Sequence, residues 1–516
     1  MPRPDASSLP ATDGQKGTQT GGSSDHKTIG LLYLVTAALV GLISVVVTVY
    51  MRLELMEPGV QYLCAEGARL WPTQAPCSAN SALWDVLTAS HGVLMMFFVA
   101  IPGLFAGFGS YLLPLHLRAP ELAFPRLNRS AYQLYVLACI MGIGALFSAH
   151  TVPVAIAALF VMGISTILTA INMITSFLNM RGPGVTLHDA SPFAWSILVT
   201  AALVLCTLPV LAGAITMMLD PSYRHAIHED DPEFYRQILW FFSHPEIYII
   251  ILPGFGIISQ IISTFSGRPL YAQKVTIYAM LAIGLLGFAT WAHYMFTRGL
   301  MAGEDSGFTL AATIVGLPTL VILFSWIMTL AQARPPWRTP LLWALGFIFL
   351  FVMGGLSGLL ISGAPVDINH AGTYFVVAHS HYVMSLGAIF ALFGGLYFWI
   401  GKMSGRNYPE WAGQLHFWLM FLGTNLTFFP QQILGQEGMP RRILDYPDQF
   451  ALLNQLSSIG AFLSFFSFLL FLGIILWTVL AGRRVPAAMQ EGVQEGMTAE
   501  WTLPSPPPPH NFERPV

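Results

Sequence analysis

Long apolar runs, separated by short polar segments, occupy most of the chain. A helix needs about 20 mainly apolar residues to cross the hydrocarbon core of a bilayer. The stretches that predict such helices are residues 29–51, 86–116, 133–149, 152–178, 192–219, 239–265, 272–297, 307–332, 340–363, 375–401, 413–435 and 452–481. The connections are short, and we see no internal repeat or second domain. The pattern predicts an all-α, polytopic membrane protein with twelve transmembrane helices.

The two ends of the chain differ in composition from the middle. Residues 1–28 are polar and rich in Ser, Thr and Gly, and they predict a flexible tail rather than a signal peptide. Residues 484–516 include the run PSPPPP, which is typical of an extended, proline-rich tail. We therefore expect one transmembrane domain over residues 29–483, with a tail at each end.

The amino-acid composition agrees with a membrane protein and argues against several classes of function. Of the 516 residues, 55% are hydrophobic and 9% are charged, whereas soluble domains are about 25% charged. The sparse charge argues against nucleic-acid binding. The four cysteines include no CxxC pair, which argues against a zinc or redox dithiol site. Cys64 and Cys77 share one polar loop, and they can form a disulfide if that loop faces an oxidising compartment.

The distribution of Lys and Arg predicts the orientation of the helices. If the N-terminus is cytoplasmic, 16 of the 23 basic residues lie in inside segments and the other 7 in outside segments. Cytoplasmic loops carry the excess of basic residues in membrane proteins. We therefore expect both termini in the cytoplasm and the loop with Cys64 and Cys77 on the outer side.

Few ionisable side chains lie at membrane depth, where such residues are rare and usually functional. They are His91, His244, Glu246, His293, His379 and His381. Helix direction and position in each span place all five histidines in the outer third of the bilayer. Isolated, hydrogen-bonded core histidines would explain one such residue, but not five at one depth. Imidazoles gathered in a dry layer favour ligation of haem or a transition metal.

The spacing of these residues indicates how they are shared. His379 and His381 are two apart on a helix, about 200° around its axis, so they face opposite sides and serve two cofactors rather than one. His244 and Tyr248 are four apart and share a face, which makes a metal ligand and a phenol neighbours. Glu246 points elsewhere on that helix. It is the only carboxylate at that depth, which suits proton transfer.

Several motifs resemble those of one family. They are SHGVLMMFF at 90–98, APELAFPRLN at 119–128, WFFSHPEIYIIILPGFGIIS at 240–259, VVAHSHYVMS at 376–385, GMPRR at 438–442 and WTLPSPPPP at 501–509. With them, nearly the whole chain resembles subunit I of cytochrome c oxidase, the catalytic subunit in the haem-copper oxidase superfamily. The likeness is to proteobacterial members, from which this chain diverges. The resemblance implies a bacterial inner-membrane protein and a catalytic domain over residues 29–483.

The resemblance also implies ligands for three cofactors. His91 and His381 would be the axial ligands of a low-spin haem, and His379 would be the axial ligand of a high-spin haem. His244 and His293 would bind a second active-site metal, copper in the oxidases, with non-haem iron as the alternative. Residues with implied roles around these cofactors are Trp240, packed beside the metal; Arg441 and Arg442, paired with haem propionates; and Arg52, bonded to the formyl group of a low-spin haem of type A.

Proton transfer is implied at a further set of residues. Tyr248 would be the active-site phenol and Glu246 the proton gate. The family's proton channel with an entrance carboxylate matches Glu121, Asn128, Asn172 and Asn179, although Ser110 replaces one asparagine and Glu121 replaces an aspartate.

Four other positions depart from the family pattern. Tyr294 stands where the oxidases have a second adjacent histidine, so the second metal loses an imidazole, which a phenolate of Tyr294 could replace. Ile322 stands where the other proton channel has its lysine, although Thr319 and Ser259 remain. Ala371 and Gly372 replace a magnesium-binding His-Asp pair, and His370 is one position away.

Three functions follow from the pattern and its departures. The first is a respiratory oxidase that passes electrons from cytochrome c, through a copper-bearing subunit II, by way of a low-spin haem to a high-spin haem and metal centre that reduces O2 to water. The second is a nitric oxide reductase of the same superfamily, converting two NO to N2O, which needs fewer electrons and protons. The third is an inert haem-binding paralogue. Further oxidase subunits are expected as partners in the first case.

Overall fold

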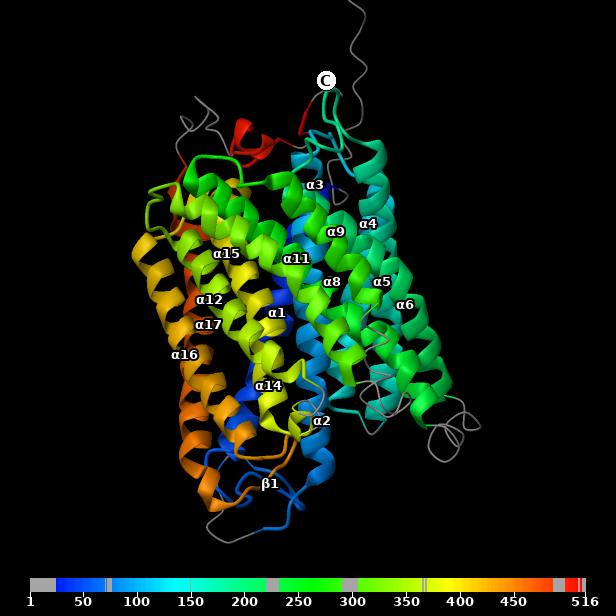
Figure 1. Ribbon diagram of the computed structural model, residues 1–516, viewed down its shortest axis with the longest axis vertical. Coiled ribbons are helices and arrows are strands. Elements are labelled where there is room, and N and C mark those ends of the chain that lie inside the picture. Colours follow the sequence, from blue (N-terminus) through cyan, green and yellow to red (C-terminus); the bar gives the residue numbers. More distant parts are fainter. Residues whose placement is uncertain are drawn as a thin grey trace, which may run out of the picture.

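A bundle of long helices makes up the body of the molecule (Figure 1). The computed structural model describes residues 25–69, 71, 77–148, 150–219, 232–289, 305–363, 366, 369–485, 497–508 and 511–512. The loop after the first helix lies at one end of the bundle, and the C-terminal segment lies at the opposite end. The site residues lie on helices between these two ends.

The first half of the chain forms five of the predicted spans. Its helices are α1 His26–Glu54, then α2 Ser81–Val93, η1 Leu94–Ala100, η2 Pro102–Gly107 and α3 Phe108–His116 as one nearly continuous stretch, then α4 Pro125–Ala145, α5 Thr151–Asn179 and α6 Pro192–Leu219. The segments η1 and η2 are π-helical. Such insertions often occur at functional sites, and this one begins three residues after His91.

The second half forms the other seven. Its helices are α8 Pro232–Ser266, α9 Gln273–Ala289, α11 Asp305–Ala331, α12 Thr339–Ile361, then α14 Tyr374–Ser380, η5 His381–Ser385 and α15 Leu386–Ser404 as one stretch, then α16 Glu410–Gln436 and α17 Ala451–Ala481. The described strands are pairs of residues, β1 Leu63–Cys64 with β2 Gly67–Ala68 and β3 Arg406–Asn407 with β4 Arg483–Arg484. Short 3₁₀ helices are η6 Asp448–Phe450 and η8 Ala499–Thr502.

Every predicted span corresponds to a helix or a continuous helical stretch. Within the described residues, nine of these stretches are long and apolar enough to cross a membrane by length and composition. The other three are α4, α16 and the shorter α9, whose predicted span continues beyond the last described residue, Ala289. The protein is therefore an all-α membrane protein, as the hydrophobic pattern predicts.

Small residues let the helices around the site approach closely. An added Cβ at Gly435 on α16 would overlap the backbone nitrogen of Phe375 on α14. An added Cβ at Gly460 on α17 would lie 2.5 Å from the backbone nitrogen of Thr427 on α16. Small residues at helix interfaces are typical of membrane proteins. The first contact holds α14, which carries His379, against α16, and the second holds α16 against α17.

The loop after α1 is held by a disulfide and by a buried carboxylate. Cys64 and Cys77 are disulfide-bonded, with their Cα atoms 5.5 Å apart. The carboxylate of Glu54, which is fully buried, accepts the backbone N–H groups of Gln61, Tyr62 and Leu63 at 2.7–3.0 Å. The disulfide that the sequence allows is therefore present.

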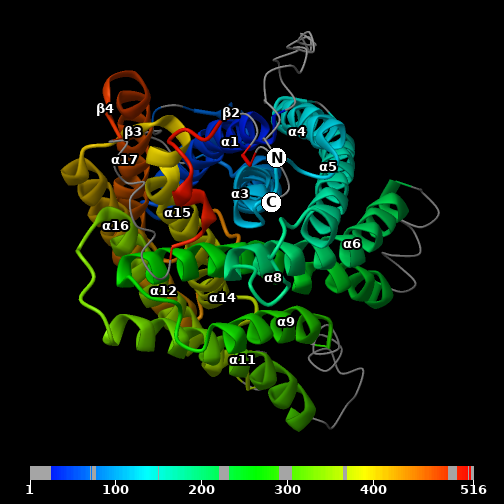
Figure 2. The same cartoon turned by 90° about the horizontal axis from the view of Figure 1, so that it is seen from above.

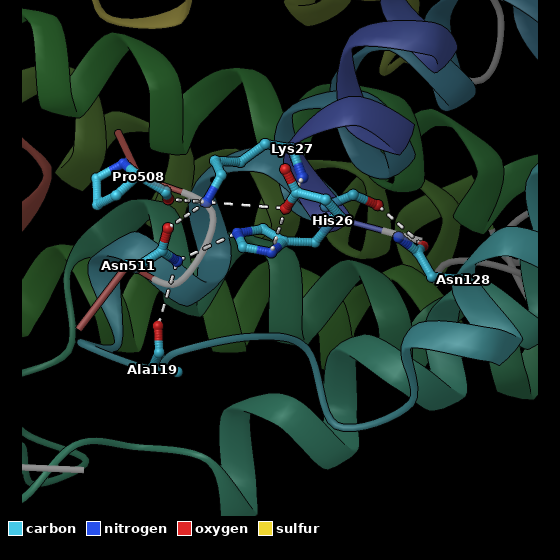
Figure 3. Close-up of polar contacts among 8 residues, drawn as sticks. His26, Lys27, Ala119, Asn128, Pro508 and Asn511 are labelled. Atoms are coloured by element: carbon cyan, nitrogen blue, oxygen red, sulfur yellow. Dashed lines mark hydrogen bonds and ion pairs between the residues drawn. The ribbon is translucent and has the colours of Figure 1, made fainter. Parts of the chain in front are cut away.

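The described part of the C-terminal tail, residues 497–508 and 511–512, packs against the opposite end of the bundle (Figure 2). Lys27 donates its ammonium to the Pro508 carbonyl at 2.6 Å and to Asn511 Oδ1 at 2.8 Å. Asn511 in turn donates to the Ala119 carbonyl at 3.2 Å and bonds to His26 (Figure 3). An extended tail is the expectation from composition, but this part of it is anchored by buried polar contacts.

Candidate functional site

His91 and His381 face each other across the bundle. Their ring centroids are 6.5 Å apart and their planes are within 7° of parallel. A metal bonded to an imidazole nitrogen lies about 2 Å from it, and the nitrogen lies about 1.1 Å from the ring centroid, so two imidazoles that bind one metal from opposite sides have their centroids about 6.2 Å apart. The two rings therefore fit the axial positions of a single haem iron.

Hydrogen bonds leave the Nε2 atom of each ring free to bind. His381 donates Nδ1–H to the Val377 carbonyl at 2.7 Å. His91 Nδ1 lies 2.8 Å from Thr48 Oγ1, which donates its own proton to the Ser44 carbonyl at 3.1 Å. Since a hydroxyl has one proton, Thr48 accepts from His91. Such partners orient metal-ligating histidines and raise their basicity.

A cavity of about 340 Å³ adjoins these two histidines. It is mainly apolar, as cofactor sites are. Arg52, which is 5% exposed, lines this cavity and donates to the Asn454 carbonyl at 2.7 Å and to Ser458 Oγ at 3.0 Å. Phe428 also lines it and stacks on His381 at 4.2 Å between ring centroids. The two histidines, the arginine and the apolar walls together fit a haem.

Arg441 and Arg442 are the residues predicted to pair with haem propionates. Arg442 lines the cavity, and its carbonyl accepts the Trp84 indole N–H at 2.9 Å. The pKa of Arg441 is lowered from its usual value, mainly by partial burial and to a smaller extent by the like charge of Arg442. Two adjacent guanidinium groups of this kind fit a ligand that brings carboxylates.

His379 lies on the opposite side of the same helical stretch. Its Nδ1 is 3.0 Å from Ser357 Oγ on α12, whereas His381 faces His91 and Phe428. The prediction that His379 and His381 point in opposite directions is therefore confirmed by their contacts. The Nε2 of His379 remains available for a second haem.

His244 and Tyr248 are neighbours on α8, as their spacing predicts. The Tyr248 hydroxyl lies 3.3 Å from His244 Nε2, and the ring centroids are 5.5 Å apart. Gly287 on α9 makes room for the phenol, because an added Cβ there would lie 2.8 Å from Tyr248 Cδ2. Glu246 on the same helix is 5% exposed, and Oε1 of its carboxyl group has no hydrogen-bond partner in the described structure.

The remaining predicted ligands of the second metal fall outside the described residues. These are His293 and Tyr294, while for Trp240 the backbone is described in α8 but the side chain is not. Among the residues that are described, no group of three or more His, Cys, Asp or Glu gathers as a metal site. The ligand set of this metal therefore stays a prediction.

Residues of the matched proton channel lie at the end of the bundle where the C-terminal segment packs. Asn128 is fully buried, and its Oδ1 accepts the Ser110 hydroxyl proton at 3.2 Å. Asn172, also buried, bonds both the N–H and the carbonyl of Phe124, at 2.9 and 3.1 Å. Glu121 interacts electrostatically with Lys27. Asn179 lies at the end of α5 and is exposed.

The positions that align with the family's other proton channel and with its magnesium site hold an apolar side chain and polar groups that already have hydrogen-bond partners. Ile322 is fully buried in the hydrophobic core. Thr319 donates to the Val315 carbonyl, and Ser259 accepts the Trp326 indole N–H at 2.9 Å. His370 Nδ1 bonds to the Val366 carbonyl at 2.8 Å.

Sequence reasoning missed the residues that orient the histidines. Thr48 and Ser357 are hydroxyl residues inside apolar helices, and neither stands out by composition. The pattern GGLSGLL around Ser357 is a weak signal, because a cluster of small residues marks a close helix contact but does not name its partner.

Comparisons with known proteins identify the family of this chain. A family model described as Cytochrome C and Quinol oxidase polypeptide I matches residues 28–463. Cytochrome c oxidase subunit 1 of Cereibacter sphaeroides is 52% identical over 532 aligned residues, which cover 95% of this chain and 94% of that protein. A heme-copper terminal oxidase dimer solved by cryo-EM has the same fold, with a TM-score of 0.70, 16% identity, and coverage of 92% of this chain and 86% of its own. The chain belongs to the family of cytochrome c and quinol oxidase subunit I proteins, which are oxidoreductases of the haem-copper type.

Proposed function

We propose that this chain is the catalytic subunit of a respiratory terminal oxidase in the bacterial inner membrane, reducing O2 to water with electrons from a cytochrome c-type donor. The observation that carries the proposal is the facing pair His91 and His381, with His379 directed to the other side of the same helical stretch. The 52% identity to a cytochrome c oxidase subunit 1 supports the same activity.

The chain's part in this reaction is to hold three redox groups at fixed positions. His91 and His381 would hold a low-spin haem, His379 a high-spin haem, and His244 with His293 a second metal, which we take to be copper. When bound, these groups supply the electron transfer and the oxygen chemistry. The apolar walls around His381 would exclude water, and Arg52, held in place by Asn454 and Ser458, would bond the edge of the low-spin haem.

Two further residues would handle protons beside the second metal. Tyr248 places its hydroxyl against His244, where it can give a proton to the reacting centre. Glu246, buried two residues after His244 in the sequence, would pass protons inward from the end of the bundle that holds Glu121 and Asn128. A buried carboxyl with a free oxygen suits a proton relay better than a structural role, since structural buried groups are hydrogen-bonded.

The partners follow from the family to which the chain belongs. As a catalytic subunit of a cytochrome c oxidase, it would receive electrons through a separate copper-bearing subunit II and assemble with further oxidase subunits. We place both termini in the cytoplasm and the disulfide-bonded loop outside, where oxidising conditions sustain such bonds.

The decisive experiment uses the purified complex. Haem and metal quantification should give two haems and copper, and the complex should consume O2 when supplied with reduced cytochrome c. N2O formation from NO, with extra non-haem iron and no oxygen uptake, would instead identify a nitric oxide reductase. A complex with two haems but no second metal, and with neither O2 uptake nor N2O formation, would be an inert paralogue.

A phenol variant tests the site itself. Tyr248→Phe removes the hydroxyl beside His244 and should lower O2 turnover by roughly 10²-fold or more, as loss of a positioned proton donor does. Tyr278→Phe is a matched control, because Tyr278 lies on α9 and is 56% exposed on the outer surface of the bundle. Equal turnover of the two variants would remove Tyr248 from the mechanism.

A further inference from the structure

One face of α12 is shaped around His379. Gly354, Ser357 and Gly358 occupy successive positions on that face, three and one residues apart. An added Cβ at Gly358 would lie 3.1 Å from His379 Cε1, tighter than ordinary van der Waals contact. An added Cβ at Gly354 would lie 2.6 Å from a side-chain methyl of Val383. Gly358 therefore brings α12 into direct contact with the imidazole, and Gly354 brings it against Val383.

Ser357 lies between these glycines and bonds the imidazole. Its hydroxyl donates to the Gly354 carbonyl at 2.8 Å, and its oxygen lies 3.0 Å from His379 Nδ1. The single hydroxyl proton is thus committed to the carbonyl, so the hydroxyl oxygen accepts the Nδ1–H of His379. The Gly354 carbonyl is also within hydrogen-bonding reach of His379. Ser357 is 5% exposed, so water does not replace this bond.

The arrangement differs from that of the neighbouring ligand. His381 donates Nδ1–H to the Val377 carbonyl of its own helical stretch, so its orientation is set locally. His379 instead depends on a side chain of another helix, 22 residues earlier in the chain. The electron-donating strength of an axial imidazole rises with the strength of the hydrogen bond from its second nitrogen. The electron-donating strength of His379 therefore depends on a side chain of α12.

We propose that Ser357 is a positioning residue, whose hydroxyl fixes the orientation and tautomer of His379 and strengthens it as the axial ligand of the high-spin haem. This inference rests on the proposed function, because it takes His379 to be that ligand. Gly358 allows α12 to lie against the imidazole ring of His379, which brings Ser357 within bonding distance. Neither residue touches a substrate.

The test compares variants of the intact complex by spectroscopy and by redox titration. Ser357→Ala removes the hydroxyl acceptor and leaves the Gly354 carbonyl as the remaining one, so a weaker hydrogen bond from His379 Nδ1–H should move the iron–histidine stretching band of the reduced high-spin haem to lower frequency. The midpoint potential of that haem should move to a more positive value, because a weaker donor stabilises the ferric state less. Ser357→Thr keeps the hydroxyl and should restore both values. The low-spin haem spectrum should not change in either variant.

Ser362→Ala is the matched control. Ser362 follows the last turn of α12 and makes the same kind of bond, to the carbonyl three residues earlier at 2.8 Å, but it lies on an exposed surface. If Ser357→Ala leaves both the stretching band and the midpoint potential where Ser362→Ala leaves them, the proposal is overturned.

Two further outcomes separate this inference from the proposed function. If the Ser357→Ala complex does not assemble, Ser357→Cys offers a side chain of similar size that is a weaker acceptor. Ser357→Cys should shift the stretching band and the midpoint potential in the same direction as expected for Ser357→Ala. If neither value shifts in Ser357→Cys, the proposal is overturned. His379→Asn should remove the high-spin haem. Retention of that haem in His379→Asn contradicts the ligand assignment itself, whatever Ser357 does.

Discussion

Lys402 offers a test of how the C-terminal segment is held on the bundle. Its side chain is buried at the end of α15, with 3% of the residue exposed. The ammonium donates to the Leu503 carbonyl at 2.6 Å and lies 5.4 Å from the centre of the Trp501 ring. Lys402→Met keeps the apolar stem and removes the charge, so it isolates these two interactions.

The expected free-energy change comes from these two interactions, because the third contact of the ammonium, with the Pro504 carbonyl, is long at 3.5 Å. A hydrogen bond to a charged group contributes about 1.5–3 kcal/mol, and a cation–π interaction contributes about 0.5–2 kcal/mol. Met also avoids the cost of burying an ammonium, so the lower part of the range applies. A net loss of about 2 kcal/mol raises the population of the undocked segment by about 30-fold, because each 1.4 kcal/mol is a factor of ten.

Amide hydrogen exchange measures this population directly. The backbone N–H groups of Trp501 and Leu503 are bonded to the carbonyls of Thr498 and Glu500, so they exchange when the segment opens. Their exchange should be about 30-fold faster in Lys402→Met than in the parent. Lys274→Met, at an exposed lysine, should leave it unchanged. Equal exchange in both variants would mean that Lys402 does not hold the segment.

Three other variants test separate parts of the structure. Thr48→Val removes the nearer acceptor of His91 Nδ1–H and leaves Ser44 Oγ at 3.3 Å, so the midpoint potential of the low-spin haem should become more positive in a redox titration, with the high-spin haem unaffected. Glu54→Gln turns an amide NH2 toward backbone donors and should speed exchange of the amides of residues 61–63, at a cost of roughly 2 kcal/mol. Glu246→Gln should lower O2 turnover by about 10²-fold or more while both haems stay bound.

Hydrophobic periodicity and helix geometry predict most of the fold and the directions of the site residues. All twelve spans appear because a bilayer requires their length and apolar character, whatever their neighbours are. The opposite faces of His379 and His381, and the shared face of His244 and Tyr248, follow from residue spacing on one helix. Local geometry alone decides such features.

Partners on other helices could not be predicted, since they depend on which helices pack together. Thr48 bonds a histidine 43 residues later, and Ser357 bonds one 22 residues later. The C-terminal segment is a similar case. Its proline-rich composition predicts extension, yet Glu500 is fully buried and lies 3.5 Å from the His116 imidazole. Composition describes the segment in isolation, whereas buried polar contacts with α3 and α15 fix it in place.

The supply of protons to the site connects the departures from the family pattern with the proposed function. The residues on the second proton route, Thr319, Ile322 and Ser259, include no ionisable group, and Ile322 is fully buried in apolar surroundings. Reducing O2 to water consumes twice the electrons and protons that reducing two NO to N2O does. On the proposed function, Glu246 is the buried carboxyl that would pass those protons inward. Turnover that survives Glu246→Gln would therefore require either another proton route or a reaction with a smaller proton demand, and measuring N2O beside O2 uptake in that one variant separates the two.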